Sequence, residues 1–208
     1  MSTNHGSLQF EYSINTILFQ RGVYPAEDFT PVKKYGLNML VTSDDQVKAY
    51  IKKIMSQLNR WMADSKISKL VIVISSKETG DAVERWQFDV QLYGKAAKKS
   101  TSRQAGDKEN SEAPGAGQEP DKDKTEKQIH DEIQSIFRQI TASVTFLPQL
   151  DGECTFNVLV YADADSDVPI EWGDSDPREI EGGEKVQLRS FSTQNHKVDT
   201  LVSYRLGE

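Results

Sequence analysis

Residues 69–92 read KLVIVISSKETGDAVERWQFDVQL, and the rest of the chain can be placed around them. Residues 70–74 form a continuous apolar run rich in β-branched side chains, which predicts a central strand covered on both faces. Residues 83–92 alternate instead, with polar side chains such as Arg85 on one side, while the apolar side holds Trp86, Phe88, Val90 and Leu92. The turn SKETGD joins the two runs, so the stretch predicts an antiparallel hairpin inside a sheet.

Two amphipathic helices are predicted before this hairpin. Residues 8–21 place four apolar side chains on one helical face, with Gly22 as the C-terminal stop, namely Phe10, Ile14, Ile17 and Leu18. A second helix is predicted to begin with a capping box from Ser43 to Gln46. Its apolar stripe comprises Val47, Tyr50, Ile51, Ile54, Met55, Leu58, Trp61 and Met62. Between these helices, residues 30–42 predict a small hairpin that turns around Lys34 to Gly36.

A third helix is predicted after the hairpin, begun by a capping box from Thr125 to Gln128. Its apolar face consists of Ile129, Ile133, Ile136, Phe137 and Ile140. Residues 144–150 look strand-like and are separated from this helix by residues 141–143. Residues 154–161, CTFNVLVY, predict another strand.

The C-terminal part of the chain has a different character. Residues 162–184 are acidic and rich in Gly and Pro, and they interrupt the sheet pattern. Residues 185–206 alternate on both sides of a Gln194–Asn195 turn, which predicts a long terminal hairpin. The sequence therefore predicts an α+β (two-layer α/β) fold, in which three central helices pack on a mainly antiparallel sheet and the C-terminal hairpin is mobile.

Residues 94–125 contain no aromatic residue and no Leu, Ile, Val or Met. Such a segment cannot bury enough apolar surface to offset its ordering entropy, so a disordered internal loop is predicted. The alternative is a linker between two domains. Because strands of matching character lie on both sides and 208 residues suit one domain, residues 1–208 are interpreted as a single domain.

Composition excludes several classes of partner and site. The formal net charge of −7 argues against nucleic acid and against an anionic membrane surface, since either would need a concentrated basic patch. No apolar run approaches the length of a membrane helix. The single cysteine, Cys154, allows no disulfide and no Cys-rich zinc site, and it is expected in the core of a protein from a reducing compartment.

No motif indicates catalysis, a metal or a cofactor. The three histidines, His5, His130 and His196, are far apart in sequence and are not accompanied by ligand clusters. Residues 163–167, DADSD, resemble the start of a calcium loop but lack its turn glycine and its closing glutamate. Residues 93–100 lack the paired glycines of a phosphate loop. The lysines at 95, 98 and 99 are interpreted as a solvated charge run rather than as a nuclear localisation signal.

The order and spacing of several motifs resemble the HORMA-domain proteins of the spindle checkpoint, from about residue 10 to residue 206. The motifs are INTILFQRGVYP (14–25), KYGLNMLV (34–41), QLNRWM (57–62), KLVIVI (69–74), ERWQFDV (84–90), RQITASVTFLP (138–148), VQLRSFST (186–193) and HKV (196–198). The resemblance implies a protein without catalytic activity that captures short peptide segments of its partners.

The implied partners are the checkpoint scaffold at unattached kinetochores (mitotic arrest deficient 1) and the co-activator of the anaphase-promoting complex. The resemblance also implies the checkpoint kinase-like subunits of the mitotic checkpoint complex, a HORMA-fold silencing adaptor and an AAA ATPase remodeller. It implies residence in the nucleus, at the nuclear envelope, at mitotic kinetochores and in the cytoplasm. The ATPase grips a stretch before the first helix in this family, and only nine residues precede Phe10 here.

The family switches between an open and a closed state that differ in the position of the C-terminal hairpin. In the closed state the C-terminal safety-belt segment, residues 162–206 here, crosses the sheet and encloses the ligand. The resemblance implies ligand contacts by Trp61, Phe156, Leu159, Tyr161 and Trp172. Each of these side chains is also compatible with core packing.

The resemblance further implies that the third helix docks an open copy on a closed copy to form a conformational homodimer. Arg138 and Gln139 match the motif positions that carry this contact, and Phe146 lies nearby in sequence. On residue chemistry alone, Arg138 could equally be a solvated cation near a helix C-terminus. Two other functions stay open: a HORMA adaptor that serves constitutively in a DNA-repair polymerase or a meiotic chromosome axis, and an unrelated hydrolase with paired titratable groups.

Overall fold

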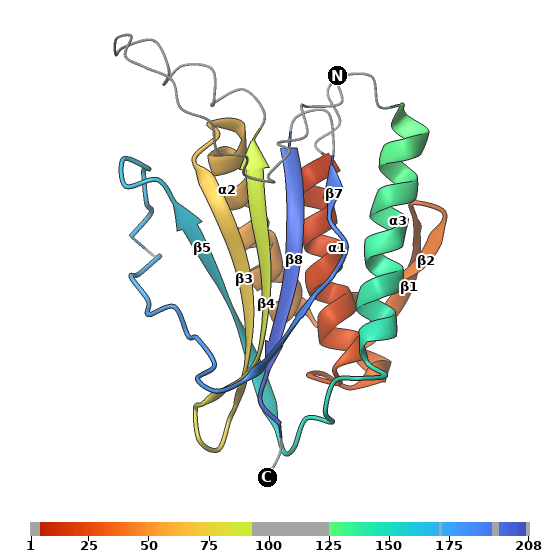
Figure 1. Ribbon diagram of the computed structural model, residues 1–208, viewed down its shortest axis with the longest axis vertical. Coiled ribbons are helices and arrows are strands. Elements are labelled where there is room, and N and C mark those ends of the chain that lie inside the picture. The colour runs from red at the N-terminus through yellow and green to blue at the C-terminus, as the bar shows by residue number, and fades with distance from the viewer. Residues whose placement is uncertain (1–4, 93–124, 171, 193–195, 207–208) are drawn as a thin grey trace, which may run out of the picture.

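The computed structural model describes residues 5–92, 125–170, 172–192 and 196–206 (Figure 1). Apart from Thr125, the predicted disordered loop 94–125 lies outside the described residues, as do the Gln194–Asn195 turn and the lysines at 95, 98 and 99. Within the described part, no helix is long and apolar enough to cross a membrane.

One six-stranded antiparallel sheet forms the body of the protein. Its strand order is β5-β3-β4-β8-β6, and β7 also pairs with β8. The strands are β3 (Ile67–Ser76), β4 (Ala82–Leu92), β5 (Cys154–Ala162), β6 (Glu184–Gln187), β7 (Phe191–Ser192) and β8 (His196–Tyr204). The predicted hairpin of residues 69–92 is confirmed as β3 and β4, and it lies at the centre of the sheet.

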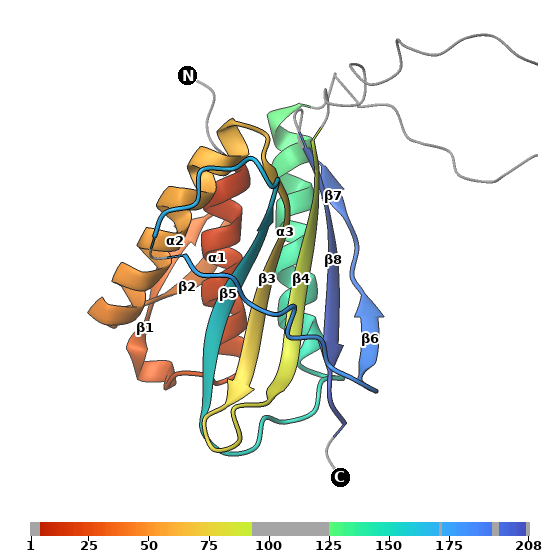
Figure 2. The same cartoon turned by 90° about the vertical axis from the view of Figure 1, so that its left-hand side faces the viewer.

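In the described part of the chain, three α-helices cover one face of this sheet, as Figures 1 and 2 show from two directions. They are α1 (His5–Gln20), α2 (Asp45–Ala63) and α3 (Glu126–Ser143). A short 3-10 turn (Ala26–Asp28) leads into a separate hairpin of β1 (Phe29–Lys34) and β2 (Leu37–Thr42) beside the helices. The predicted α+β class, with three helices on an antiparallel sheet, is confirmed.

Successive side chains of β3 point to opposite faces of the sheet, and both faces are apolar. Leu70, Ile72 and Ile74 pack with the helices in the main core, whereas Val71 and Val73 pack with Leu159 on the opposite, outer face. All five β3 residues are at most 1% exposed, which confirms the prediction of a strand covered on both faces.

Two local predictions are wrong. The N-cap of α2 is Asp44, whose side chain accepts a hydrogen bond from the Val47 amide at 2.8 Å. Ser43 lies one residue before this cap, and its amide donates to the Asp28 carbonyl at the end of the β1–β2 hairpin. A carboxylate also suits the positive end of a helix. The Thr125–Gln128 capping box of α3, in contrast, is confirmed.

The second wrong prediction is the strand-like stretch 144–150. α3 continues through residues 141–143, and the chain then makes turns in which the amides of Thr145 and Phe146 donate to Ala142 and Ser143. Pro148 supplies no amide to a sheet ladder, so the apolar letters of this stretch do not form a strand. The next strand begins at Cys154, which is buried as predicted.

The C-terminal hairpin occupies the β4 side of the sheet. β8 pairs with β4 from Glu84↔Tyr204 to Leu92↔His196, and β6 pairs in turn with β8. The predicted terminal hairpin is therefore confirmed in its strands. β5, at the other end of the strand order, is paired with β3 alone among the described residues.

A buried ion pair ties the end of α1 to the sheet. The Arg21 guanidinium donates through Nε to both carboxylate oxygens of Glu84, at 3.0 and 2.9 Å, and its side chain also donates to the Pro148 carbonyl. The Trp86 indole donates to the same carboxylate at 2.6 Å. This cluster links α1, β4 and the connection between α3 and β5.

Candidate functional site

The first part of the candidate site is the open edge of β5. Alternate amides of an edge strand have no neighbouring strand to bond to, so they are available to an added strand. The amide of Val158 donates instead to the side-chain oxygen of its neighbour Asn157, at 2.9 Å. The same oxygen accepts a hydrogen bond from the Tyr50 hydroxyl at 2.9 Å. The open edge is thus occupied locally by a side chain.

Residues 163–183, the crossing segment, lead from the end of β5 around this edge and over the outer face of the sheet to β6 (Figures 1 and 2). Its start is fixed on the β5 side, where the Asp163 amide donates to the Lys66 carbonyl at 2.7 Å. No strand is present in its described part, which confirms that the sheet pattern stops here.

Two tryptophans hold the crossing segment against α2. The Trp61 indole donates to the Asp167 carbonyl at 3.1 Å, and the Trp61 and Trp172 rings meet edge to face with their centroids 5.0 Å apart. Trp61 is only 4% exposed, whereas Trp172 is half-buried. Aromatic edge-to-face pairs contribute about 0.5–1.5 kcal/mol beyond their buried area, so this contact helps to hold the segment against α2.

A cavity of about 490 Å³ lies between α2, the open edge of β5 and the crossing segment. Its lining combines apolar, amide and charged groups: Tyr50, Lys53, Ile54, Asn157, Val158, Leu159, Trp172, Gly173, Asp174 and Ser175. Burial raises the pKa of Tyr50 above its ordinary value, partly offset by a hydrogen bond to the Val158 backbone. Its hydroxyl therefore stays protonated near neutral pH and can donate hydrogen bonds.

The five predicted ligand-contact residues do not all lie at this cavity. Leu159 and Trp172 line it, and Trp61 reaches it indirectly through its contact with Trp172. Phe156 points into the main core, where its ring contacts Tyr24 and Tyr50. Tyr161 lies on the outer face under the ammonium group of Lys69, 4.9 Å from the ring centroid. Their roles in ligand binding stay predictions.

Sequence reasoning missed the polar part of the lining. Tyr50 was placed on the apolar stripe of α2, but it is 38% exposed and bonds to Asn157. Asn157 is the one amide within the otherwise apolar and aromatic run from Phe156 to Tyr161, and that interruption is the signal that could have identified it.

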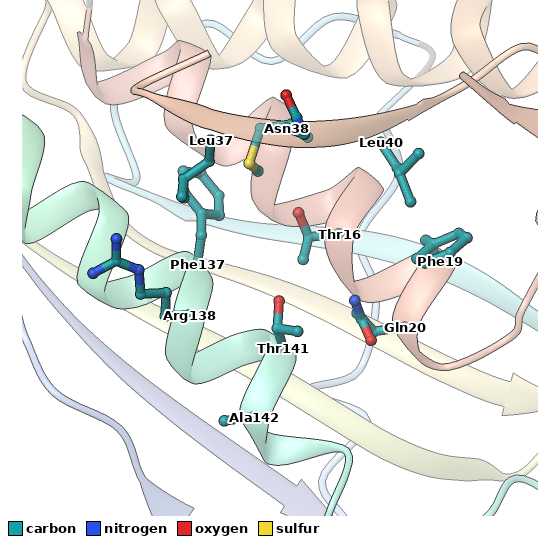
Figure 3. Close-up of a pocket in the computed structure, with 11 residues that line it drawn as sticks. Thr16, Phe19, Gln20, Leu37, Asn38, Leu40, Phe137, Arg138, Thr141 and Ala142 are labelled. Carbon is teal, nitrogen blue, oxygen red and sulfur yellow. The ribbon is translucent and has the colours of Figure 1, made fainter. Parts of the chain in front are cut away.

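A second candidate surface surrounds the predicted self-docking residues. Arg138 is exposed on α3 and donates to the Gln134 side chain at 3.3 Å. It borders a cavity of about 320 Å³ between α1, β2 and α3 (Figure 3), lined by Thr16, Phe19, Gln20, Leu37, Asn38, Met39, Leu40, Phe137, Arg138, Thr141 and Ala142. Phe146, just beyond α3, is 45% exposed.

Gln139 has an intramolecular partner that the sequence did not reveal. Its side-chain oxygen accepts a hydrogen bond from the Arg189 amide at 2.7 Å, between β6 and β7. Nearer the N-terminus of α3, the Glu132 carboxylate accepts a hydrogen bond from the Ser192 amide at 2.8 Å. The helix that was predicted to dock a second copy therefore also holds the C-terminal hairpin in its observed position.

The fold and these surfaces define a class of protein: an α+β domain whose main sheet is antiparallel and whose C-terminal segment wraps around the open edge strand of that sheet. The HORMA domain pattern matches residues 7–196, and the chain belongs to the HORMA domain family. A crystal structure of a mitotic checkpoint complex contains a chain that matches with a TM-score of 0.79 and 50% identity, covering 96% of both chains.

Curated relatives extend this result. The mitotic spindle checkpoint component mad2 of Schizosaccharomyces pombe is 54% identical over 198 residues, covering 95% of this chain and 89% of the relative. The mitotic spindle assembly checkpoint protein MAD2A of Homo sapiens is 44% identical and covers 95% and 87% of the two chains. The Caenorhabditis elegans protein HTP-2 bound to a HIM-3 closure motif shares the fold, with a TM-score of 0.69 at 13% identity, covering 95% of this chain and 87% of that one.

Proposed function

We propose that this chain captures an extended peptide segment of a partner at the open edge of β5 and encloses it with the crossing segment. The observation that carries the proposal is the combination of an edge strand that pairs on one side only in the described part, a cavity beside its open side, and a segment that passes around both. An added strand gains main-chain hydrogen bonds along such an edge, while side-chain pockets provide selectivity.

The chain acts in the spindle assembly checkpoint, because relatives named for that checkpoint match nearly its whole length at high identity. It binds other checkpoint proteins and belongs to mitotic cell-cycle control. A constitutive adaptor role in a DNA-repair polymerase or a meiotic chromosome axis is not favoured by these relatives.

The finer assignments are part of the proposal. The captured segments belong to the checkpoint scaffold and to the co-activator of the anaphase-promoting complex, and the complex includes the checkpoint kinase-like subunits. A HORMA-fold silencing adaptor and an AAA ATPase reverse its assembly. The protein works without catalytic activity at kinetochores and resides in the nucleus, at the nuclear envelope and in the cytoplasm.

The position of the C-terminal hairpin supports capture in a closed state. With β8 on β4, the opposite edge is open, and the crossing segment between them is long enough to pass around a ligand. If the hairpin had a second position at the β5 edge, the two packings would compete for the same chain. A peptide that contacts only the closed state shifts that balance by its differential affinity, and about 5.5 kcal/mol moves it from 1:99 to 99:1.

Trp172 provides the test of peptide capture. Truncation of a central aromatic anchor often costs about 2 kcal/mol or more, which corresponds to roughly thirtyfold in affinity. We expect Trp172→Ala to weaken binding by that order. The measurement is fluorescence anisotropy with a fluorescein-labelled synthetic peptide that carries the partner-binding segment of the checkpoint scaffold.

Ile170 supplies the matched control, because it belongs to the same segment and its side chain is fully exposed. Ile170→Ala should bind the peptide within about twofold of the parent chain, since it removes no buried contact. Equal affinities for the parent chain and Trp172→Ala, or no binding by the parent chain, would contradict capture at this site.

A further inference from the structure

The crossing segment is fastened a second time, far from the two tryptophans, where it passes over the outer face of β3 and β4. Here Arg178 extends from the segment to the β3–β4 turn. One of its terminal nitrogens donates to the Ser75 hydroxyl at 3.2 Å and to the Gly80 carbonyl at 2.9 Å. A single side chain thus joins the crossing segment to both ends of the central hairpin's turn.

Arg85 makes the reverse connection, from β4 to the crossing segment. Its Nε donates to the Pro177 carbonyl at 3.1 Å, and a terminal nitrogen forms an ion pair with the Glu179 carboxylate at 3.5 Å. Its other terminal nitrogen donates to the Gln87 side chain at 2.6 Å. The two connections near Pro177 are therefore reciprocal: Arg178 of the segment bonds to the hairpin, and Arg85 of the hairpin bonds to the segment.

The burial of Arg85 shows that the crossing segment packs closely on the outer face of β4. This side chain lies on the predicted polar face of β4, yet it is only 1% exposed in the structure. Arginine is rarely buried without partners, and here the crossing segment supplies a carbonyl that accepts from Nε and a carboxylate in an ion pair, although the terminal nitrogen of that pair makes no hydrogen bond. Release of the segment would return the guanidinium to water and would break both connections.

The backbone at Arg178 also has an unusual conformation. Its φ of +50° lies in the left-handed region, which non-glycine residues rarely adopt. The Asp176 side chain stabilises this turn by accepting a hydrogen bond from the Arg178 amide at 2.8 Å. The turn directs the guanidinium toward β3, so the strained conformation serves the contact with Ser75 and Gly80.

We infer that Arg85 and Arg178, with their partners Ser75, Gly80, Pro177 and Glu179, form a clasp that keeps the crossing segment shut. This inference rests on the proposed function for its consequence. A peptide enclosed under the segment can leave only when the segment opens, so the clasp sets the lifetime of the captured peptide. The two arginines are positioning residues, because they lie on the outer face and act through the segment.

Opening can be measured without a peptide by placing a thiol under the clasp. Val73 is 1% exposed on the outer face and pairs with Arg85 in the sheet, so Val73→Cys reports when the segment lifts. Cys154→Ala in every variant removes the native thiol. We expect Arg178→Gln to increase the rate of labelling by Ellman's reagent about tenfold and Ser75→Ala to increase it about threefold, because each removes part of the clasp.

The exposed Lys185 on β6 supplies the matched control, since Lys185→Gln removes the same charge outside the clasp. It should label like the parent, and Arg178→Gln should lose no more unfolding free energy than the about 1.4 kcal/mol that corresponds to a tenfold change in opening. Equal labelling rates for Arg178→Gln and its parent would overturn the clasp. A labelling rate that rises with urea concentration as steeply as global unfolding does would overturn it as well.

A second measurement separates the clasp from peptide capture. Dissociation of the fluorescein-labelled scaffold peptide should be about tenfold faster from Arg178→Gln than from Lys185→Gln. Faster labelling with unchanged peptide release would overturn the role of the clasp in release while leaving capture intact. If no variant binds the peptide, the proposed function fails, and the labelling rates still decide whether the clasp exists.

Discussion

Asn157 occupies the position that a captured strand needs. Its side-chain oxygen accepts from the Val158 amide and from the Tyr50 hydroxyl, both at 2.9 Å, so an incoming carbonyl must displace it. A hydrogen bond of this kind contributes about 0.5–1.5 kcal/mol net, which corresponds to roughly twofold to twelvefold in an equilibrium constant. Asn157→Ala should therefore accelerate association of the scaffold peptide about threefold, measured by stopped-flow fluorescence.

Thr155 provides the comparison for Asn157, because it is exposed on the same edge strand two residues earlier. Thr155→Ala should leave the association rate unchanged, since the Val158 amide is bonded to the Asn157 side chain and not to Thr155. A slower association of Asn157→Ala would show that the amide assists binding instead of competing with it.

At the scale of the element, α3 serves two surfaces. Gln139 and Glu132 bind the backbone of the C-terminal hairpin, while Arg138 remains exposed beside the cavity between α1, β2 and α3 (Figure 3). If the helix docks a second copy, Arg138→Glu places the wrong charge at that surface. We expect about tenfold weaker self-association by sedimentation velocity, equivalent to about 1.4 kcal/mol.

Lys127 gives the same charge reversal away from this surface. It is exposed in the first turn of α3, where a carboxylate is favourable, so Lys127→Glu should not destabilise the helix. It should self-associate like the parent chain. If both variants weaken equally, the effect comes from net charge, and Arg138 has no specific role in docking.

Elements with strong periodicity could be predicted from the sequence, and surfaces made by tertiary contacts could not. β3 and β4 follow from the hydropathy pattern alone, because a short run that is apolar at every position indicates a strand covered on both faces, and strict alternation indicates a strand with one buried face. The strand predicted at 144–150 is absent from the structure. The prediction considered only the apolar side chains of this stretch, whereas a sheet also requires backbone amides, and Pro148 has none. Arg85 was assigned correctly to the polar side, but its burial depends on Pro177 and Glu179, which lie about ninety residues further on.

The same limit applies to the candidate site. Leu159 and Trp172 could be assigned from the family resemblance, and both line the cavity beside β5. Tyr50 and Asn157 were missed because their hydrogen bond joins α2 to β5, 107 positions apart, and no local pattern encodes such a pair. Gln139 was assigned to one surface only, because its bond to Arg189 depends on where the hairpin lies.

At the scale of the whole molecule, the closed arrangement is held at two separate points of the crossing segment. The Trp61–Trp172 contact fixes the part beside α2, and the clasp fixes the part over β3 and β4. A peptide could therefore be enclosed between two closures, one mainly apolar and one charged. The Arg85–Glu179 ion pair of the clasp is buried on its arginine side, so salt should screen it less than it screens a fully exposed pair.

Glu84 gives the whole fold a dependence on pH, since it joins α1, β4 and the connection after α3. Burial raises the pKa of its carboxyl above 4.5, and the opposing influence of Arg21 and of the Trp86 indole does not cancel this effect. Between the unfolded pKa and the raised folded pKa, the native state binds more protons than the unfolded state. The contribution of Glu84 to stability is therefore fully present below about pH 4.5 and is lost as pH rises through the folded pKa.

Glu84→Gln removes this titration while keeping an oxygen that can accept from Trp86. The unfolding free energy of the parent minus that of Glu84→Gln should be largest at and below about pH 4.5 and should fall as pH rises. The total fall is about 1.4 kcal/mol for each unit by which the pKa of Glu84 is higher in the folded state than in the unfolded state. Urea denaturation at a series of pH values gives this difference, with exposed Glu184→Gln as the control variant. A difference that increases with pH would mean that Arg21 outweighs burial, and that the ion pair stabilises the ionised carboxylate.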